Sequence, residues 1–242
     1  MEVHHTHSSG KKWHHHLWEF LMLFFAVFCG FLAEYYLEQT IEHHREEQFM
    51  SSLVEDLSLD TTEVKLRISQ VEDTKRFSDS AIAFLNSYKP ASTIPAYFGN
   101  QLIAAQQRLR LINTDRTSTQ LKNSGGMRLI RNKKVIDQIL AYWKQVEESQ
   151  SSLDRYLVIR NAGRDLTFKL FRTNISYSDS VPIKNIKNLD VIDDDPKKWF
   201  ELTNLIAISR QIAKGEHSTN LHKQYESALE LIKTIKEEYH LK

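Results

Sequence analysis

The chain has 242 residues, and its 32 Lys and Arg against 31 Asp and Glu leave a formal net charge of +1. This balance excludes the strong overall basic charge typical of nucleic-acid-binding proteins, so no nucleic-acid partner is expected. The single cysteine, Cys29, excludes an intrachain disulfide, and the low content of 7 Gly and 4 Pro indicates long helices with few turns.

The chain begins with a histidine-rich tract, residues 1–16, which also contains Lys11 and Lys12. Neutral imidazoles bind transition metals, so a metal site is one interpretation of the tract. No Cys or Asp accompanies the histidines at a fixed spacing. We therefore favour a charged tail and predict no metal and no cofactor.

Residues 17–37 form the most apolar stretch of the chain. Every residue from Phe20 to Phe28 except Ala26 has a large apolar side chain, so a helix here would be apolar on every side, which favours lipid over a protein core. A helix from Trp13 to Tyr36 would be about 35 Å long, enough to cross a hydrocarbon core of about 30 Å. We predict a single transmembrane helix; the alternative is a buried helix of a soluble bundle. Aromatic residues typical of a membrane–water interface flank it on both sides: Trp13, Trp18, Tyr35 and Tyr36.

The charges on the two sides of this segment predict its orientation. Lys11 and Lys12 precede it, whereas Glu34 and Glu38 follow it. Because Lys and Arg accumulate on the cytoplasmic side, residues 1–16 are expected in the cytoplasm and residues 38–242 in the periplasm of a bacterial inner membrane. No small-residue cleavage site precedes a cut at Ala33, so the segment is expected to remain as an anchor.

Small residues recur on one side of the segment. Ala26 and Gly30 are four residues apart, a spacing that lets two helices approach closely. Glu19 lies on the same side, and His15, four residues earlier, is its expected partner. One hypothesis is a span that associates with a second copy; the other is a monomer whose Glu19 reaches the interface. The predicted association residues are Glu19, Ala26, Gly30 and Ala33.

The helix is expected to continue beyond the membrane as a stalk. From Val54 to Leu85 apolar residues recur in steps of three and four, as in a helix packed along one side. His43 and Glu47 lie one turn apart, but the zinc-protease spacing H-E-x-x-H is absent, so a solvated face is favoured over a metal site.

The charges of the extramembrane part are unevenly distributed. Those from Glu34 to Glu63 are acidic apart from Arg45, and those from Arg108 to Lys134 are basic apart from Asp115. One interpretation is that the two stretches neutralise each other inside one bundle. The other is that the basic stretch binds an anionic partner or a lipid headgroup.

A corner is predicted after a second helix over residues 95–113. Thr117 and Gln120 have the spacing of a capping box, which predicts a short helix. Gly125 and Gly126 would end this helix, because glycine tolerates the left-handed conformation. Backbone amides beside basic side chains make the corner a candidate anion or partner site; the alternative is a tight structural turn. The candidate residues are Lys122, Gly125, Gly126, Arg128 and Arg131.

Three further helices complete the predicted fold. They cover residues 133–171, 196–214 and 218–239, with Asp195 as the N-cap of the second and Gly215 as its stop. Gly163 marks close packing or a bend. The fold class is therefore all-α: one N-terminal transmembrane helix, a stalk and an extramembrane antiparallel bundle of about five helices.

Several local motifs together resemble an uncharacterised family of single-span bacterial inner-membrane proteins. They are the His-rich start with KKW, the span ending in CGFLAE, the HHREEQ run and the LKNSGGMRLI corner. The resemblance covers about the first two thirds of the chain. It implies a membrane topology, and it implies no reaction and no catalytic residue.

The sequence contains no motif of an enzyme. A Ser/His/Asp order, a phosphate-binding loop and a Cys/His metal framework are all missing. The leading hypothesis is a membrane-anchored interaction or scaffold protein that acts without catalysis, with lipid and a second copy or a membrane complex as partners. The alternative is a sensor or accessory subunit whose bundle binds a ligand or partner; a metal-binding protein or enzyme ranks below both.

Overall fold

The structure, a computed structural model, describes residues 10–87, 94, 96–173 and 189–241. The chain divides into two compact units, residues 1–49 and 50–242. The described residues are mostly helical, as predicted, with one short pair of strands. Residues 1–9 of the predicted tail lie outside the described residues.

Helix α1 (Gly10–Ser87) is continuous and contributes residues to both units. It begins earlier than the predicted span, because residues 10–16 of the expected tail are already helical. Glu19 contacts His15 as predicted, with 3.1 Å between Oε1 and Nε2, and it also contacts His16. These i,i+4 and i,i+3 contacts support the first turns of the helix.

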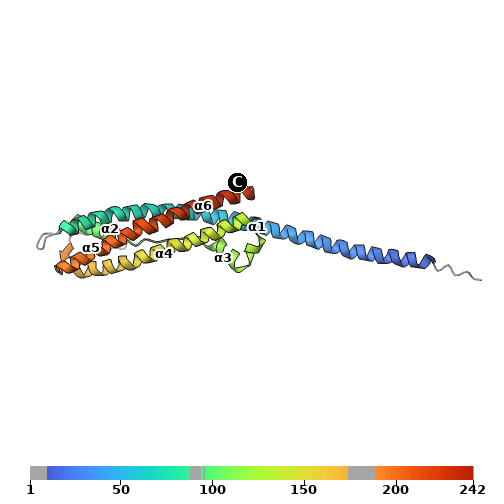
Figure 1. The fold of residues 1–242 in the computed structure, drawn as a ribbon, viewed down its shortest axis with the longest axis horizontal. Coiled ribbons are helices and arrows are strands. Elements are labelled where there is room, and N and C mark those ends of the chain that lie inside the picture. Colours follow the sequence, from blue (N-terminus) through green and yellow to red (C-terminus); the bar gives the residue numbers. More distant parts are fainter. Residues whose placement is uncertain (1–9, 88–93, 95, 174–188, 242) are drawn as a thin grey trace, which may run out of the picture. The chain divides into compact units, whose positions relative to one another are not determined.

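The second unit is built from three long helices (Figure 1). They are the part of α1 from residue 50 onward, α4 (Lys133–Leu170), and a helix that runs through α5 (Pro196–Gln211), η2 (Ile212–His217) and α6 (Ser218–Glu238). Asp195 caps α5 as predicted, since its carboxylate accepts a hydrogen bond from the amide of Lys197.

The predicted stop at Gly215 is wrong. Gly215 lies inside η2, a short π-helical stretch that joins α5 to α6 without a break. Its φ is not positive, and Ala213 and His217 on either side of it are buried in the core. Because the residues on both sides of Gly215 are buried, the chain stays helical here, with a wider π-helical turn in place of an α-helical one.

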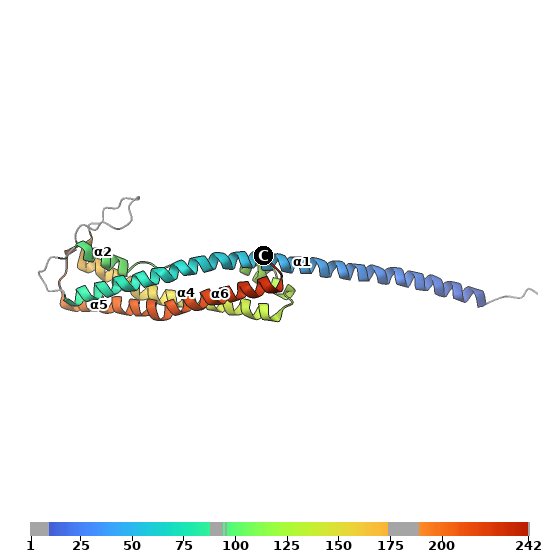
Figure 2. The same ribbon diagram turned by 90° about the horizontal axis from the view of Figure 1, so that it is seen from above.

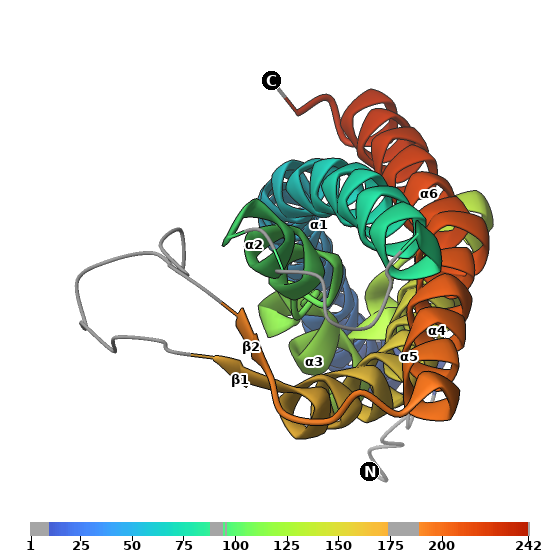
Figure 3. The same cartoon turned by 90° about the vertical axis from the view of Figure 1, so that its left-hand side faces the viewer.

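The bundle is only partly antiparallel, which corrects the prediction. Both α1 and α4 run in the same direction, because Asp60 meets Tyr142 near one end while Leu85 and Leu170 share a core cluster at the other. The helix formed by α5, η2 and α6 runs against α4 (Figure 2). Seen end-on, α2 (Ala96–Ala105) lies on the side away from α5 and α6 (Figure 3).

The segment after α2 explains the parallel arrangement. Helix α2 ends at Ala105, so the predicted helix over residues 95–113 is too long. Residues 106–115 return along α1 in an extended form, from a contact of Gln107 with Thr74 to one of Thr114 with Asp60. That path is about 20 Å along α1, and a helix over residues 107–114 would cover only about 10 Å.

Hydrogen bonds to the long helices replace the missing helical ones in this segment. The carbonyl oxygen of Gln106 accepts from Arg160 Nε at 2.7 Å, and that of Gln107 accepts from the Tyr156 hydroxyl at 2.7 Å. Because buried backbone groups need partners, these contacts make the extended path stable.

A pair of short antiparallel strands joins α4 to α5. Strand β1 (Phe171–Thr173) pairs with β2 (Leu189–Val191), and Phe171 lies opposite Val191. The long helix therefore ends at Leu170, and Phe171, predicted as helical, begins the strand. Its ring packs edge-on against Trp199 with 5.2 Å between the centroids.

Two apolar clusters lie in the core of the described part of the bundle. One lies among the C-terminal part of α1, α2, the end of α4 and the start of α5, and the other lies around η2. Helix α4 continues through Gly163, where an added Cβ would lie at ordinary van der Waals contact, 3.5 Å from Leu205 Cβ. The second cluster consists of Val64, Val71, Leu109, Leu153, Tyr156, Ala213 and Leu221.

Candidate functional site

The N-terminal part of α1 exposes large apolar side chains on all sides. From Trp13 to Ile41 the large apolar residues in the exposed class are 40–68% accessible. Among the described residues, α1 is the one helix that is long and apolar enough to cross a membrane, and none of its most apolar window is buried. Length and composition alone define this property. A surface of this kind is a candidate for contact with lipid or with another apolar helix.

The predicted association residues lie along one side of this helix. At 100° per residue, Glu19, Ala26, Gly30 and Ala33 fall within a sector of about 60°. Phe20, Phe24 and Phe28 stack on the opposite side, with 6.4 and 6.0 Å between successive ring centroids. A Cβ added at Gly30 would meet no atom within 4 Å. No contact with the described residues of the same copy therefore requires glycine here.

The corner adopts part of the predicted geometry. Gly125 has a φ of 68°, the expected left-handed conformation, whereas Gly126 is buried and begins η1 (Gly126–Leu129). The amide of Arg128 donates to the carbonyl oxygen of Gly125 at 3.1 Å. This amide therefore serves the turn itself and is not available to an anion.

The basic side chains of the corner point to different environments. Lys122 lies over the ring of Trp143 on α4, with 4.3 Å from Nζ to the ring centroid. Arg128 and Arg131 are exposed. Lys122 thus stabilises the corner through a cation–π contact.

The capping box predicted at Thr117 does not form. Thr117 lies inside α3 (Arg116–Asn123), and its buried hydroxyl has no hydrogen-bond partner. Its amide instead donates to Asp56 Oδ2 at 2.9 Å, and Arg116 donates to Asp56 Oδ1 at 2.8 Å. A carboxylate of α1 therefore takes the role of the N-cap of α3.

A second buried carboxylate joins three segments. Asp60 accepts hydrogen bonds from the amide of Thr114 at 2.6 Å and from the hydroxyl of Tyr142 at 2.7 Å. Burial raises the pKa of Asp60, and the bonds from Tyr142 and Thr114 oppose this rise. Burial is the largest cause that raises the pKa of Tyr142, and the negative charge of Asp60 raises it further. Both oxygens of Asp60 are engaged, so the pair holds the bundle together and offers no free base.

A buried histidine lies in the π-helical stretch. The Nδ1 atom of His217 lies 2.9 Å from the Ser152 hydroxyl, and its Nε2 atom is buried without a partner. Burial lowers the pKa of His217 to about 4, so the ring is neutral at physiological pH. Sequence reasoning missed this residue because no motif surrounds it.

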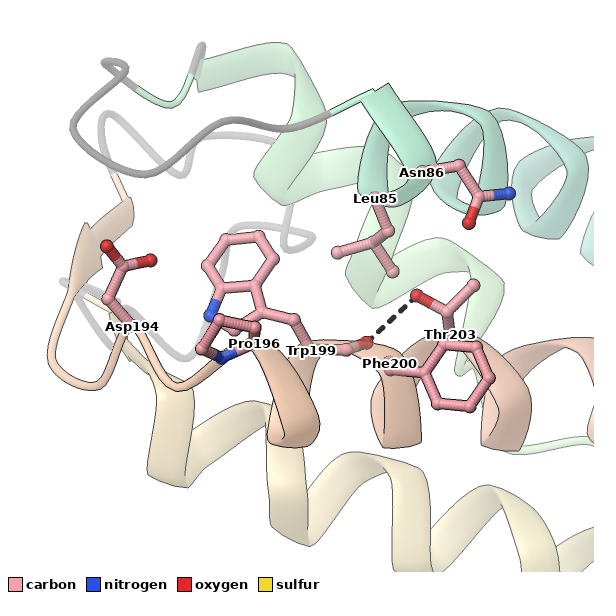
Figure 4. A pocket seen from close by; sticks show the side chains of 7 residues that line it. All are labelled: Leu85, Asn86, Asp194, Pro196, Trp199, Phe200 and Thr203. Atoms are coloured by element: carbon pink, nitrogen blue, oxygen red, sulfur yellow. Dashed lines mark hydrogen bonds between the residues drawn. The ribbon is translucent and has the colours of Figure 1, made fainter.

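A pocket of 270 Å³ lies at one end of the bundle (Figure 4). Leu85 of α1 and Trp199 and Phe200 of α5 give it an apolar lining, and Asp194 is its one carboxylate. The hydroxyl of Thr203 donates to the carbonyl oxygen of Trp199 at 2.9 Å. This arrangement offers apolar contact and no base beside the hydroxyl.

The described residues contain no group of three or more His, Cys, Asp or Glu arranged to hold a metal ion. His43 Nε2 lies 3.4 Å from Glu47 Oε1, one turn further along α1. Comparison with family models, with curated proteins and with solved structures finds no match to the chain.

Proposed function

We propose that the chain is a membrane-anchored interaction protein that acts by association and not by catalysis. The observation that carries the proposal is the apolar part of α1, whose large side chains are exposed around the whole helix. Water-soluble surfaces rarely present such an area, whereas a hydrocarbon core stabilises it. Lipid is therefore the first partner that we propose.

Sequence features support the rest of the topology. Lys11 and Lys12 before the span and the acidic residues after it favour a cytoplasmic N-terminus and a periplasmic bundle. The resemblance to single-span inner-membrane proteins is in line with this orientation.

We further propose that two spans associate through their small-residue sides. Ala26, Gly30 and Ala33 would let the two backbones approach, and the stacked phenylalanines on the opposite side would face lipid. Partner binding by the bundle would use the corner at Gly125, where Arg128 is exposed. A homo-oligomer or an accessory subunit of a membrane complex would follow.

Membrane insertion is tested with the full chain in bacterial membranes. We expect the protein to stay in the membrane pellet after alkaline carbonate extraction. Protease added to spheroplasts should degrade the bundle while the N-terminus stays protected. A freely soluble product, or a bundle that the protease cannot reach, would overturn the proposed anchor or its orientation.

Association of spans is tested by Gly30→Leu, with Phe28→Leu as the control on the opposite side of the helix. We expect Gly30→Leu to lower the dimer fraction at least tenfold and Phe28→Leu to leave it unchanged. Cys29, the single cysteine, is exposed near the small-residue side and gives a direct readout by oxidative cross-linking in membranes. Equal cross-linking of all three proteins would contradict the proposed interface.

The alternative function, a ligand-binding sensor or accessory subunit, is favoured by one specific observation. Three arginines, Arg108, Arg160 and Arg164, meet in a groove of the bundle, where they could bind an anionic ligand.

A further inference from the structure

One groove of the bundle gathers arginines from two segments of the chain. Arg108 lies just after α2, and Arg160 and Arg164 lie one turn apart on α4. Asn100 and Ile103 of α2 also line this groove, which has a volume of 610 Å³. We call it the arginine groove. Its volume falls within the range of about 300–1,000 Å³ that is typical of small-molecule sites.

The central arginine is buried and held in place. Arg160 is 9% exposed, its Nε donates to the carbonyl oxygen of Gln106, and its Nη1 donates to Asn161 Oδ1 at 2.8 Å. Its Nη2 atom makes no hydrogen bond to the described residues. Burial lowers the pKa of Arg160, and the positive charges of Arg164 and Arg108 lower it further.

The two outer arginines lie at the edges of the same groove. Arg164 lies over the ring of Phe168, with 5.2 Å from its Cζ to the ring centroid. This contact orients the guanidinium without neutralising its charge. Arg108 is exposed and makes no hydrogen bond or ion pair with the described part of the chain.

Several other arginines of the bundle have carboxylate partners, unlike those of the groove. Arg67 pairs with Glu63 at 2.8 Å, and Arg155 pairs with Glu216. Over residues 10–87, 94, 96–173 and 189–241, no carboxylate lies within ion-pair distance of any arginine in the groove. The negative charge of Asp165 raises the pKa of Arg160, but by less than the charges of Arg164 and Arg108 lower it. The three like charges therefore repel one another, and a bound anion would relieve this repulsion.

We propose that the arginine groove binds a ligand that carries a phosphoryl or pyrophosphoryl group. Guanidinium groups present planar pairs of donors that match the oxygens of such a group, and hydrogen bonds between two charged partners are the stronger kind. The side chain of Ile103 supplies an apolar wall for the rest of the ligand. The inference concerns the bundle alone and does not rest on the proposed membrane anchor.

The proposal is tested with the full chain in a nonionic detergent, with inorganic pyrophosphate as the probe in isothermal titration calorimetry. We expect saturable binding of about one pyrophosphate per chain, with chloride at matched ionic strength producing no heat. Arg108→Gln and Arg164→Gln should each weaken binding about tenfold, the size expected for loss of one charge-assisted contact. Absence of saturable binding would overturn the proposal.

Arg110→Gln is the matched control, because Arg110 is also exposed, lies two residues from Arg108 and does not line the groove. We expect its affinity for pyrophosphate to stay within twofold of the parent chain. An equal loss with Arg110→Gln would show general charge attraction and would contradict a built site. Arg160→Lys keeps the charge but loses the planar fork, and it should weaken binding while its circular dichroism spectrum stays unchanged.

A phosphoryl group can belong to a soluble ligand or to a lipid headgroup, and a competition experiment distinguishes the two sources. Phosphatidylglycerol or phosphatidylcholine is added to the micelles before the titration. A fall in pyrophosphate affinity only with phosphatidylglycerol would assign the site to an anionic headgroup. Equal affinity in both mixtures would assign it to a soluble ligand.

Discussion

The two parts of helix α1 have the same secondary structure but differ in the exposure of their side chains. In residues 13–41 large apolar side chains such as Phe20 and Leu23 are 63% and 67% exposed. In residues 50–87 one side of the helix is buried, as at Leu57 and Val71, and even Asp60 is only 2% exposed. A helix satisfies its own backbone in either setting, so the difference lies in the side chains. The first part exposes apolar side chains, for which we propose lipid as the partner, and the second buries polar groups that contact distant segments.

The largest expected effect comes from placing charge in the first part. The double variant Leu23→Arg with Phe24→Arg should disfavour insertion by about 5–7 kcal/mol, since each central arginine costs about 2.5–3.5 kcal/mol. We expect the protein to move from the membrane pellet to the soluble or aggregated fraction. Leu59→Arg is the control from the second part, where Leu59 is 58% exposed, and it should leave the distribution unchanged. An unchanged pellet for the double variant would mean that the two parts of α1 meet the same solvent.

The next effect concerns the second part, where Asp60→Ala leaves two buried donors without a partner. The amide of Thr114 and the hydroxyl of Tyr142 would lose their acceptors, and we expect the free energy of unfolding to fall by about 3–5 kcal/mol. Urea unfolding of the full chain in detergent measures this loss. Glu55→Ala, an exposed neighbour, should cost under about 0.5 kcal/mol. Equal costs for the two variants would show that Asp60 does not hold the segments together.

The apolar repeat of α1 places Asp60 at a core position, but the repeat alone does not show what Asp60 contacts. Leu53, Leu57 and Val64 follow steps of four and seven, and Asp60 occupies the intervening core position of this repeat. A charged residue at such a position predicts a buried partner. The partner itself, Thr114, lies 54 residues away along the chain, and local pattern cannot supply it.

The correct predictions depend on local sequence patterns, whereas the wrong ones concern contacts between segments that are distant along the chain. Helix α4 and the Asp195 cap of α5 depend on local periodicity and capping chemistry, and both are confirmed. The extended segment after α2 and the continuous helix through Gly215 depend on tertiary contacts that override local preference. The arginine groove also escaped prediction, because Arg108 and Arg160 come together only through that extended segment.

A smaller effect is expected when the bundle is acidified. The pKa of His217 is lowered from 6.5 to about 4 in the folded chain, so the unfolded chain binds the proton first as the pH falls. Stability is therefore fully present above pH 6.5 and is lost between pH 6.5 and pH 4, by about 3 kcal/mol at pH 4. Glu216 is the neighbouring carboxylate, and its charge opposes the shift.

This loss is measured as the difference between the parent chain and His217→Gln, which share every other titrating group. The free energy of unfolding of His217→Gln should fall about 3 kcal/mol less between pH 7 and pH 4. His222→Gln, at an exposed position of α6, should retain the parent profile. Parallel profiles for the parent and His217→Gln would contradict a neutral buried imidazole.

The smallest effect on stability is expected from substitutions of Gly125, which test whether backbone geometry alone holds this corner. Gly125 has a φ of 68°, and a Cβ there would meet no atom within 4 Å, so Gly125→Ala changes strain without creating a clash. We expect a loss of about 1 kcal/mol for Ala and a smaller loss for Asn, which tolerates the left-handed region. Thermal unfolding of both variants measures the difference. If Gly125→Ala and Gly125→Asn lose the same stability, the left-handed conformation of Gly125 does not determine the structure of the corner. The bundle would then depend on side-chain contacts such as that of Lys122 with Trp143, as the second part of α1 depends on Asp60.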